Sequence, residues 1–313
     1  MRIVRRVAVF ALVLVLGLIG LAARSQQPPS VGAGAVAREG IGGRALGVGG
    51  AFSAIADDAT AGYYNPAGLA TLSGIRIGGM IERRFAPGSS FQYLCGSGRL
   101  EAIGLAAGAS IIWRSDTGIP YEGGTFDAVD SMWLISAAYD LGGVAPLGRI
   151  SMLAFGANLK LYAAAGLEER RSRGIGFDAS ALVGLSLDEL TLRVSYMSSD
   201  IGGSTIQWEG TLQEIAEVIP WLHRFGAALL WDAMGIVISG DVDLVPGQSN
   251  LNRVRFGAAY RFRGFSFRGG LDGGTPTIGV GAEILDGFAF DAAIRFHPSD
   301  LGQSYVISSE FRF

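Results

Sequence analysis

Hydrophobic and polar positions alternate with a period of two along most of the chain. From Arg253 to Arg263 the even-numbered positions are apolar or small, and four of the odd-numbered positions are arginine. The same alternation runs from Gly174 to Leu187 and from Gly287 to His297. Successive side chains of a β-strand point to opposite faces, so this pattern predicts strands with one apolar and one polar face.

Turn signals divide residues 74–313 into about fourteen such strands, an even number as in bacterial single-chain barrels. One amphipathic strand also fits a soluble sandwich, whereas many in series with charges on the polar face favour a closed barrel. The predicted fold is therefore all-β, a transmembrane antiparallel β-barrel. The predicted strands cover 75–84, 89–95, 100–113, 130–140, 150–162, 174–186, 190–198, 222–231, 235–244, 253–262, 264–270, 277–285, 287–297 and 304–313.

The predicted connections alternate between long and short. The links 114–129, 163–173 and 199–221 are long, and 186–189, 232–234, 263–264 and 285–287 are short. If the barrel begins in the periplasm, the long links face the cell surface. The link 141–149 is longer than the other links on the periplasmic side. Within the longest link, residues 212–219 form a candidate amphipathic helix.

The composition is more typical of a membrane protein than of a soluble protein. The chain of 313 residues is 49% hydrophobic and 17% charged, with a mean hydropathy of +0.36. Beyond residue 25, however, no apolar run reaches the roughly 18 residues that a membrane-spanning helix needs. The hydrophobic residues are therefore expected in strands that face outer-membrane lipid.

The N-terminus carries an export signal. Arg2, Arg5 and Arg6 precede an uncharged stretch from Val7 to Ala23, and small residues flank Arg24. This predicts a cleaved signal peptide over residues 1–25, with a retained membrane anchor as the alternative. Export and a barrel together predict the bacterial outer membrane as the location. The last strand ends in Phe313 and resembles the C-terminal signature that barrel-assembly machinery recognises.

Residues 26–73 differ from the rest because they are rich in glycine and alanine and do not alternate. Residues 43–52 read GRALGVGGAF, and residues 56–70 read ADDATAGYYNPAGLA. The segment resembles the N-terminal hatch of the FadL-type superfamily of outer-membrane proteins, which implies a plug inside a barrel of fourteen strands. The motif positions are Arg44, Asp57, Asp58, Tyr64, Asn65, Pro66 and Ala67.

The resemblance implies two functions. FadL-type channels pass small hydrophobic molecules such as fatty acids or aromatic compounds, and a kink in their third strand opens a lateral gate. The length of this barrel and the sequence of residues 44–52 are closer to the PorV/PorQ-like branch. This resemblance implies an adaptor that binds exported proteins or a secretion complex. Passive uptake of a hydrophobic ligand is the leading hypothesis, and the adaptor with a secreted-protein partner is the alternative.

The residues of the motif also have a local explanation. Asp57 or Asp58 can cap a short helix, and Pro66 pushes Asn65 towards extended geometry. The Asn-Pro-Ala sequence can therefore fix a turn, handle a ligand, or do both.

The polar faces of the strands are expected to line the lumen. Their charges have mixed signs, which favours paired side chains over a strongly selective ion pore. The predicted lumen-facing residues are Glu82, Asn158, Lys160, Asp178, Arg193, Asp241, Asp243, Arg255, Arg261, Glu283, Asp291 and Arg295.

Other classes of function lack the residues that they need. Histidine occurs only as His223 and His297, and Cys95 is the only cysteine, so neither a catalytic relay, a metal centre nor a disulfide framework is indicated. No basic run follows the signal, and the net charge is −3, so no nucleic acid partner is expected. The glycines near Gly47 do not match a dinucleotide-binding motif. We therefore expect no catalytic residues, no metal and no cofactor.

Overall fold

A computed structural model describes residues 34–84, 88–142, 148–166, 170–210, 215–249, 252–298 and 302–313. The signal peptide predicted over residues 1–25 lies outside the described residues. The strands are β1 (Ile75–Arg83), β2 (Ser89–Leu100), β3 (Leu105–Tyr121), β4 (Gly124–Asp140), β5 (Ile150–Ala165), β6 (Arg171–Leu187), β7 (Leu190–Ser199), β8 (Ser204–Glu209), β9 (Ile215–Ile219), β10 (Leu222–Trp231), β11 (Ile236–Leu244), β12 (Arg253–Phe262), β13 (Phe265–Asp272), β14 (Thr275–Leu285), β15 (Phe288–Phe296) and β16 (Gln303–Arg312).

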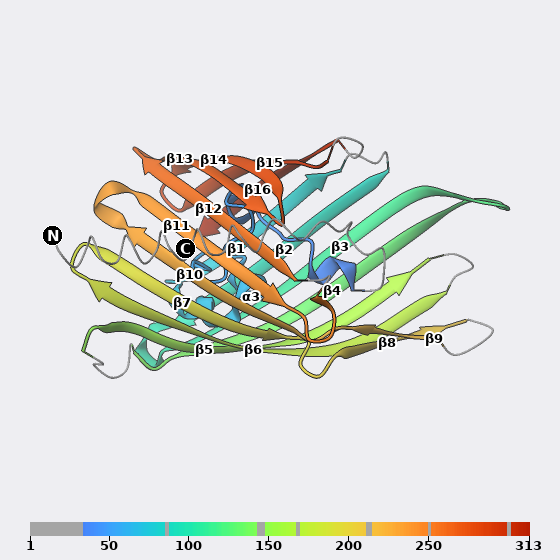
Figure 1. Ribbon diagram of the computed structural model, residues 1–313, viewed down its shortest axis with the longest axis horizontal. Coiled ribbons are helices and arrows are strands. Elements are labelled where there is room, and N and C mark those ends of the chain that lie inside the picture. The colour runs from blue at the N-terminus through green and yellow to red at the C-terminus, as the bar shows by residue number, and fades with distance from the viewer. Residues whose placement is uncertain are drawn as a thin grey trace.

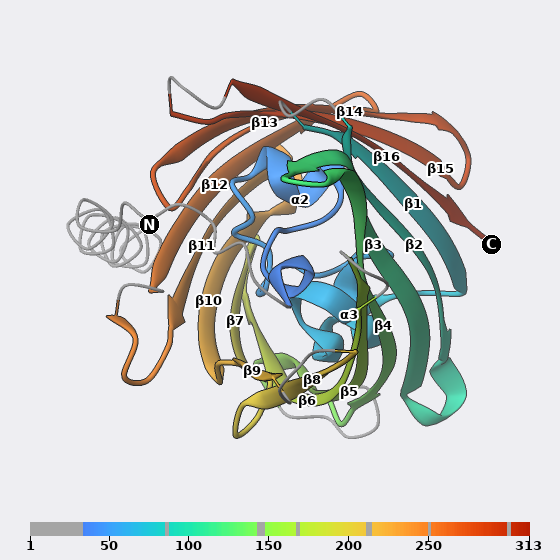
Figure 2. The ribbon, with the colours of Figure 1, turned by 90° about the vertical axis from the view of Figure 1, so that its right-hand side faces the viewer.

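Fourteen of these strands close into one antiparallel barrel, as the alternation predicted. Each of β1–β7 and β10–β16 pairs with its neighbours in the ring, β7 pairs with β10, and β16 closes the ring against β1. Figure 1 shows the tilted strands from the side, and Figure 2 looks along the barrel. Closure leaves the wall without an open edge, which is why a sheet of this kind can cross lipid.

The two faces of the wall separate as period two requires. In β16, Tyr305, Ile307 and Phe311 are exposed on the outer surface, while Val306 and Glu310 are buried on the inside. No helix within the described residues is long and apolar enough to cross a membrane.

Several predicted boundaries were wrong. On the side of the short links, the third strand begins at Leu105, after a short 3-10 turn, η3 (Glu101–Ile103), and not at residue 100. The other errors are on the side of the long links. The predicted loop 114–129 is the outer part of a hairpin in which β3 and β4 run on to Tyr121 and Gly124. The amphipathic helix predicted over 212–219 is wrong, because Ile215–Ile219 is strand β9 paired with β8. These outer strands continue by pairing with their neighbours, which a helical or loop-like sequence pattern does not reveal.

Residues 34–72 lie inside the barrel (Figure 2). They form η1 (Ala35–Ala37), α2 (Gly43–Gly47), α3 (Ala61–Tyr64) and η2 (Pro66–Thr71), joined by turns. Between Ile41 and Leu72 almost every residue is buried, and only Arg44, Asp57, Thr60 and Thr71 keep intermediate exposure. We call residues 34–72 the inner segment. The apolar core of the molecule is the layer between this segment and the wall.

Candidate functional site: the inner segment and its luminal contacts

The inner segment approaches the wall most closely at glycines. Gly257 of β12 and Gly270 of β13 are paired, and a side chain on either would collide with the backbone of Val48 or Gly49. On the other side of the lumen, a side chain on Gly156 of β5 would collide with the backbone of Pro66 and Ala67. Only glycine allows such approach, so these positions set where the segment lies.

The predicted Asn-Pro-Ala motif fixes a turn. Asn65 is extended, as Pro66 predicts, and its side-chain oxygen accepts a hydrogen bond of 3.0 Å from the N–H of Ala67 at the start of η2. The Asn65 side-chain amide donates to the carbonyl of Ser53 (2.8 Å). Asn65 is completely buried, so both bonds hold one part of the inner segment against another.

Tyr64 also joins two parts of the inner segment, because its side chain reaches Ile41. Its hydroxyl donates to the carbonyl of Ile41 (2.8 Å) and accepts from the N–H of the same residue (3.0 Å). The ring packs edge-on against Phe52, with 5.2 Å between ring centroids. Burial raises the pKa of the Tyr64 hydroxyl well above its usual range. The group therefore stays protonated and can act as a donor and an acceptor.

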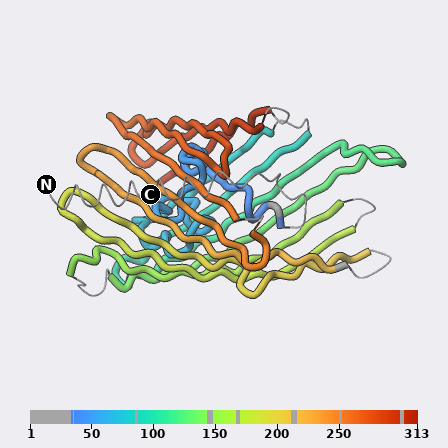
Figure 3. Tube along the Cα trace, in the orientation of Figure 1, coloured from blue at the N-terminus to red at the C-terminus, as the bar shows by residue number. Residues whose placement is uncertain are grey.

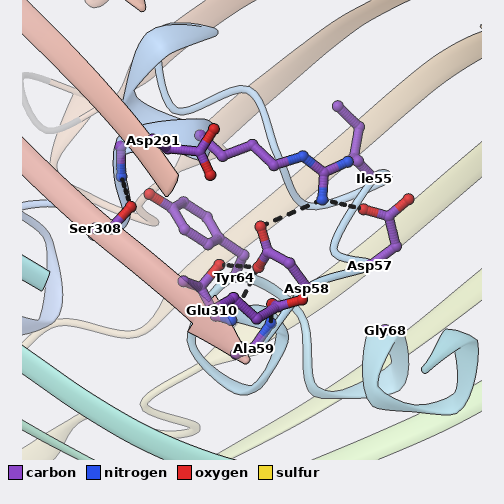
Figure 4. Close-up of polar contacts among 12 residues, drawn as sticks. Ile55, Asp57, Asp58, Ala59, Tyr64, Gly68, Asp291, Ser308 and Glu310 are labelled. Atoms are coloured by element: carbon purple, nitrogen blue, oxygen red, sulfur yellow. Dashed lines mark hydrogen bonds and ion pairs between the residues drawn. The ribbon is translucent and has the colours of Figure 1, made fainter. Parts of the chain in front are cut away.

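Asp57 and Asp58 form a charged cluster with Arg44 (Figure 4). Arg44 lies 2.7 Å from Asp57 and 3.3 Å from Asp58, and Arg193 of β7 lies 3.6 Å from Asp57. Burial raises the pKa of Asp57, but the guanidinium groups of Arg44 and Arg193 outweigh it and lower this pKa below its ordinary value.

The pKa of Asp58 is shifted in the opposite direction from that of Asp57. Burial and the nearby Glu310 carboxylate raise the pKa of Asp58, against the attraction of Arg44. Its side chain accepts hydrogen bonds from the backbone N–H and the hydroxyl of Thr60 (2.9 and 2.6 Å). The predicted aspartate cap of a helix is absent in α3, because Thr60 occupies the N-cap position without a side-chain bond and Asp58 binds Thr60 instead.

The wall holds the inner segment through single polar side chains. The Asp241 carboxylate accepts hydrogen bonds from the backbone N–H groups of Phe52 and Ser53 (3.1 and 3.0 Å) and from the Ser53 hydroxyl (2.8 Å). The Glu310 carboxylate accepts from the N–H of Ala59 (2.5 Å), as Figure 4 shows. Asn158 donates to the carbonyl of Gly62 (2.9 Å).

Wall serines supply further contacts that the sequence did not indicate. Ser308 accepts from the N–H of Gly43 (2.8 Å), Ser180 accepts from the N–H of Ala67 (3.0 Å), and Ser239 donates to the carbonyl of Ala51 (2.7 Å). A small polar residue on the inner face of a strand was the available signal, but it does not name its partner.

The remaining predicted lumen charges form pairs within the wall. Arg255 contacts Asp243 at 2.8 Å and Asp272 at 3.0 Å, and Lys160 contacts Asp178 at 2.7 Å. Arg268 contacts Asp291 at 2.6 Å, and Arg295 pairs with Glu82. Arg295 also donates to the carbonyl of Glu39 in the inner segment (2.9 Å).

Two of the predicted lumen-facing residues take no part in this network. Arg261 and Glu283 are exposed near the ends of β12 and β14, and Glu283 pairs with Arg312 at 3.1 Å. Alternation assigns a residue to a face, but it does not say whether the lumen at that height is filled. Among the described residues, no group of three histidine, cysteine, aspartate or glutamate side chains is arranged to hold a metal ion.

The fold defines a class of protein, the closed antiparallel β-barrel of fourteen strands, here with the inner segment in its lumen. No family model matches the sequence, and no curated protein matches it. Solved structures do match. The Pseudomonas putida toluene transporter TodX aligns with a TM-score of 0.59 and 14% identity, covering 88% of this chain and 98% of that one. A Pseudomonas aeruginosa FadL homologue aligns with a TM-score of 0.55 and 11% identity, covering 87% and 97%. At these identities the likeness shows that the chain has the barrel fold of FadL-type proteins.

Proposed function

We propose that this protein is an outer-membrane channel for the passive passage of small hydrophobic molecules, and that the inner segment is its plug. The observation that carries the proposal is the way in which the inner segment is held. It lies inside a closed barrel and contacts the wall through separate polar groups, such as Asp241, Glu310 and Ser308, and not through a shared sheet.

This kind of attachment suits a plug that moves. A single hydrogen bond contributes only about 1 kcal/mol net, so a few bonds can break together without unfolding the barrel. The ladders of β12 with β13 and of β13 with β14 are continuous beside the segment, so this part of the wall would remain intact. The names of the two similar structures, a toluene transporter and a FadL homologue, support a hydrophobic cargo. The leader predicted over residues 1–25 supports delivery to the outer membrane.

The test is uptake into vesicles whose outer leaflet contains lipopolysaccharide, with radiolabelled toluene as the probe. Vesicles that contain the protein should take up toluene faster than empty vesicles. Asn65→Ala loosens the inner segment and should change the rate further, whereas Ser266→Ala, on the wall strand β13, should not. Uptake equal to that of empty vesicles, in the wild type and in Asn65→Ala alike, would sink the proposal.

The adaptor hypothesis makes a different prediction, namely that an exported protein co-purifies with the barrel at a stoichiometric level. Neither similar structure named above is an adaptor, and only the sequence resemblance favours this role. A pull-down from solubilised outer membranes tests it independently of the uptake measurement.

A further inference from the structure

A hollow of about 720 Å³ lies on the outer surface of the wall, between β10, β11 and the link that follows β11. We call this space the outer hollow. Its wall side is lined by His223 and Phe225 of β10 and Leu244 of β11, and its link side includes Val245, Ser249 and Asn252. Figure 2 shows the link, in orange, projecting outside the ring of strands.

Hydrogen bonds within the link give the outer hollow a defined shape. The N–H of Val245 donates to the side-chain oxygen of Asn252 (2.9 Å), so the two ends of the link are held together. The N–H of Gln248 donates to the carbonyl of Val245, and the N–H of Asn252 donates to the carbonyl of Ser249 (3.1 Å each). Small-molecule sites have volumes of roughly 300 to 1,000 Å³ and mostly apolar linings. The outer hollow has this size, and the link keeps its shape by its own hydrogen bonds.

Aromatic and polar side chains of β7 and β10 surround His223 on this outer surface. The hydroxyl of Tyr196 lies 2.8 Å from Nδ1 of His223, and the two rings are stacked with 6.1 Å between their centroids. The ring of Trp221 lies 4.7 Å from the His223 ring, and its N–H donates to the Ser198 hydroxyl (2.7 Å). Tyr196 thus engages Nδ1, and no other described residue bonds to Nε2. Nε2 is therefore available to a molecule in the outer hollow.

The outer hollow opens onto the apolar surface that faces lipid. Phe225 and Leu244 are exposed, and so is Val194 of β7 in the next row of outward-facing side chains. Because strand direction alternates, the link after β11 lies at the same end of the barrel as the β3–β4 hairpin, as the trace in Figure 3 shows. This end is expected at the cell surface, so the adjoining lipid belongs to the outer leaflet. An acyl chain can lie on Phe225 and Leu244 without leaving the apolar layer.

The lining of the outer hollow indicates which kind of lipid it takes. None of the described residues that line it is lysine, arginine, aspartate or glutamate. A phosphate group is usually bound by arginine or lysine, so this lining would not select a phosphate. The side chains of His223, Ser249 and Asn252 suit hydroxyl groups, which both donate and accept hydrogen bonds. A lipid with a sugar headgroup carries such hydroxyls beside its acyl chains.

Aromatic side chains at a membrane surface are common and do not define a site by themselves. Tyr260 and Phe262 of β12 stack with 6.3 Å between their centroids near the opposite end of the barrel, and both are exposed. The cluster around His223 differs, because a link encloses the space beside it and because Nε2 has no partner within the described chain. These two features indicate a bound molecule in addition to an interfacial aromatic belt.

We propose that the outer hollow binds one glycolipid molecule of the outer leaflet. An acyl chain lies on Phe225 and Leu244, and a sugar hydroxyl bonds to Nε2 of His223. A hydroxyl can donate or accept, so it fits either tautomer of His223. The site lies outside the lumen, so this inference goes beyond the proposed passage of hydrophobic molecules. It shares with that proposal only the location in an outer membrane.

The experiment measures the binding of monophosphoryl lipid A to the purified protein in detergent by native mass spectrometry. Ser249→Trp places a large side chain in the outer hollow. Ala137→Trp is the control, because Ala137 is exposed on the outward face of β4, in another part of the wall. The heat-dependent migration of the barrel in a denaturing gel confirms that each variant is folded.

The wild type and Ala137→Trp should bind lipid A with the same affinity. Ser249→Trp should bind it at least about tenfold more weakly, since the acyl chain loses its place on the wall. Equal affinity of all three proteins, or an equal loss in both variants, would overturn the site.

A second comparison tests the sugar contact. Phosphatidylethanolamine has acyl chains but no sugar, so the wild type should bind it more weakly than lipid A. His223→Ala should weaken lipid A binding about fivefold, the value of one net hydrogen bond, and should leave phosphatidylethanolamine binding unchanged. Phosphatidylethanolamine that binds as tightly as lipid A would overturn the recognition of a glycolipid. Lipid A binding that His223→Ala leaves unchanged would overturn the contact with His223.

Toluene uptake separates this inference from the proposed function. In the vesicles described above, Ser249→Trp should take up toluene at the wild-type rate, because the outer hollow lies outside the lumen. Toluene uptake by a wild type that does not bind lipid A would refute the outer hollow alone. Lipid A binding without toluene uptake would refute the channel alone.

Discussion

Two charged clusters inside the barrel have the same composition and different surroundings. Each contains one cation and two carboxylates. The exposed fractions of the side chains are 29%, 24% and 10% in the cluster of Arg44, Asp57 and Asp58, and 4%, 0% and 4% in the cluster of Lys160, Asp178 and Asp200, which we call the wall cluster. The first cluster lies within the inner segment, and the second lies in the wall.

The difference in exposure decides what each cluster can do. Water screens the Arg44 cluster, so breaking it changes the free energy of unfolding little. The wall cluster is buried, so removal of one charge leaves others buried and unpaired. A partly exposed cluster therefore suits an element that moves readily, and a buried one suits a part of the wall with a single defined geometry.

The largest expected effect is in the wall cluster. Lys160→Met leaves Asp178 and Asp200 without their cation, and the free energy of unfolding should fall by about 3 to 5 kcal/mol. Urea unfolding in vesicles, followed by tryptophan fluorescence, measures this. A loss no larger than that in Arg44→Met would contradict the comparison between the two clusters.

A smaller effect is expected where the wall holds the plug. Asp241→Ala removes the acceptor of two buried N–H groups and a hydroxyl. The Ser53 hydroxyl keeps Ser195 as a partner and water can enter the space of the lost carboxylate, so the net loss should be about 1 to 3 kcal/mol. Hydrogen exchange at Phe52 and Ser53 should accelerate, while exchange in the β2–β3 ladder stays slow. Unchanged protection at both residues would show that Asp241 does not hold the plug.

Loss of the cation from the Arg44 cluster should have a weaker effect on the free energy of unfolding. Arg44→Met should lower the free energy of unfolding by less than about 1 kcal/mol, as for other partly exposed pairs. Among the described residues, the ionic partners of Arg44 are Asp57 and Asp58, and both belong to the inner segment. Protease sensitivity of residues 55–60 should therefore rise before the barrel melts. Cleavage in the wall strands at the same protease concentration would argue against a separable plug.

The smallest effects concern pH, and the two aspartates should act in opposite directions. The pKa of Asp57 is lowered in the folded protein, so its contribution is present above its ordinary pKa and is lost as the pH falls. The pKa of Asp58 is raised, so its contribution is present at low pH and is lost as the pH rises through the shifted value. Asp57→Asn should therefore flatten the loss of stability on acidification, and Asp58→Asn should steepen it. Acid titrations of both variants that change in the same direction would be inconsistent with this assignment.

The strands of the wall were predictable because period two is a local property. The spans from Arg253 to Phe262 and from Leu222 to Trp231 agree with β12 and β10 at both ends. The outer parts of β3 and β4 were not predictable, because their residues become strands by pairing with each other and carry little alternation of their own. The same reason explains why Ile215–Ile219 looked helical and is strand β9.

The candidate site was predictable in part. The extended Asn65 and several inward-facing charges, such as Asp241 and Arg255, followed from the sequence, whereas Glu310, Arg224 and Asp272 did not. The partners did not follow, because Asp241 and Ser53 are far apart in the chain and alternation carries no information about distance in space. The irregularity after β7 was also missed. Residues 199–221 were predicted as a long link, whereas they contain β8 and β9, and the pairing along β6 shifts by three residues between β7 and β8.

The sequence by itself determined the alternating faces of the strands, the even ring that they form and the different character of residues 26–73, since each depends on neighbours along the chain. Only the tertiary structure decided which charges pair, where the inner segment touches the wall and where the pairing between strands shifts. Those features depend on strand register and on ring closure, and a shift of a few residues in one strand changes them without changing the pattern.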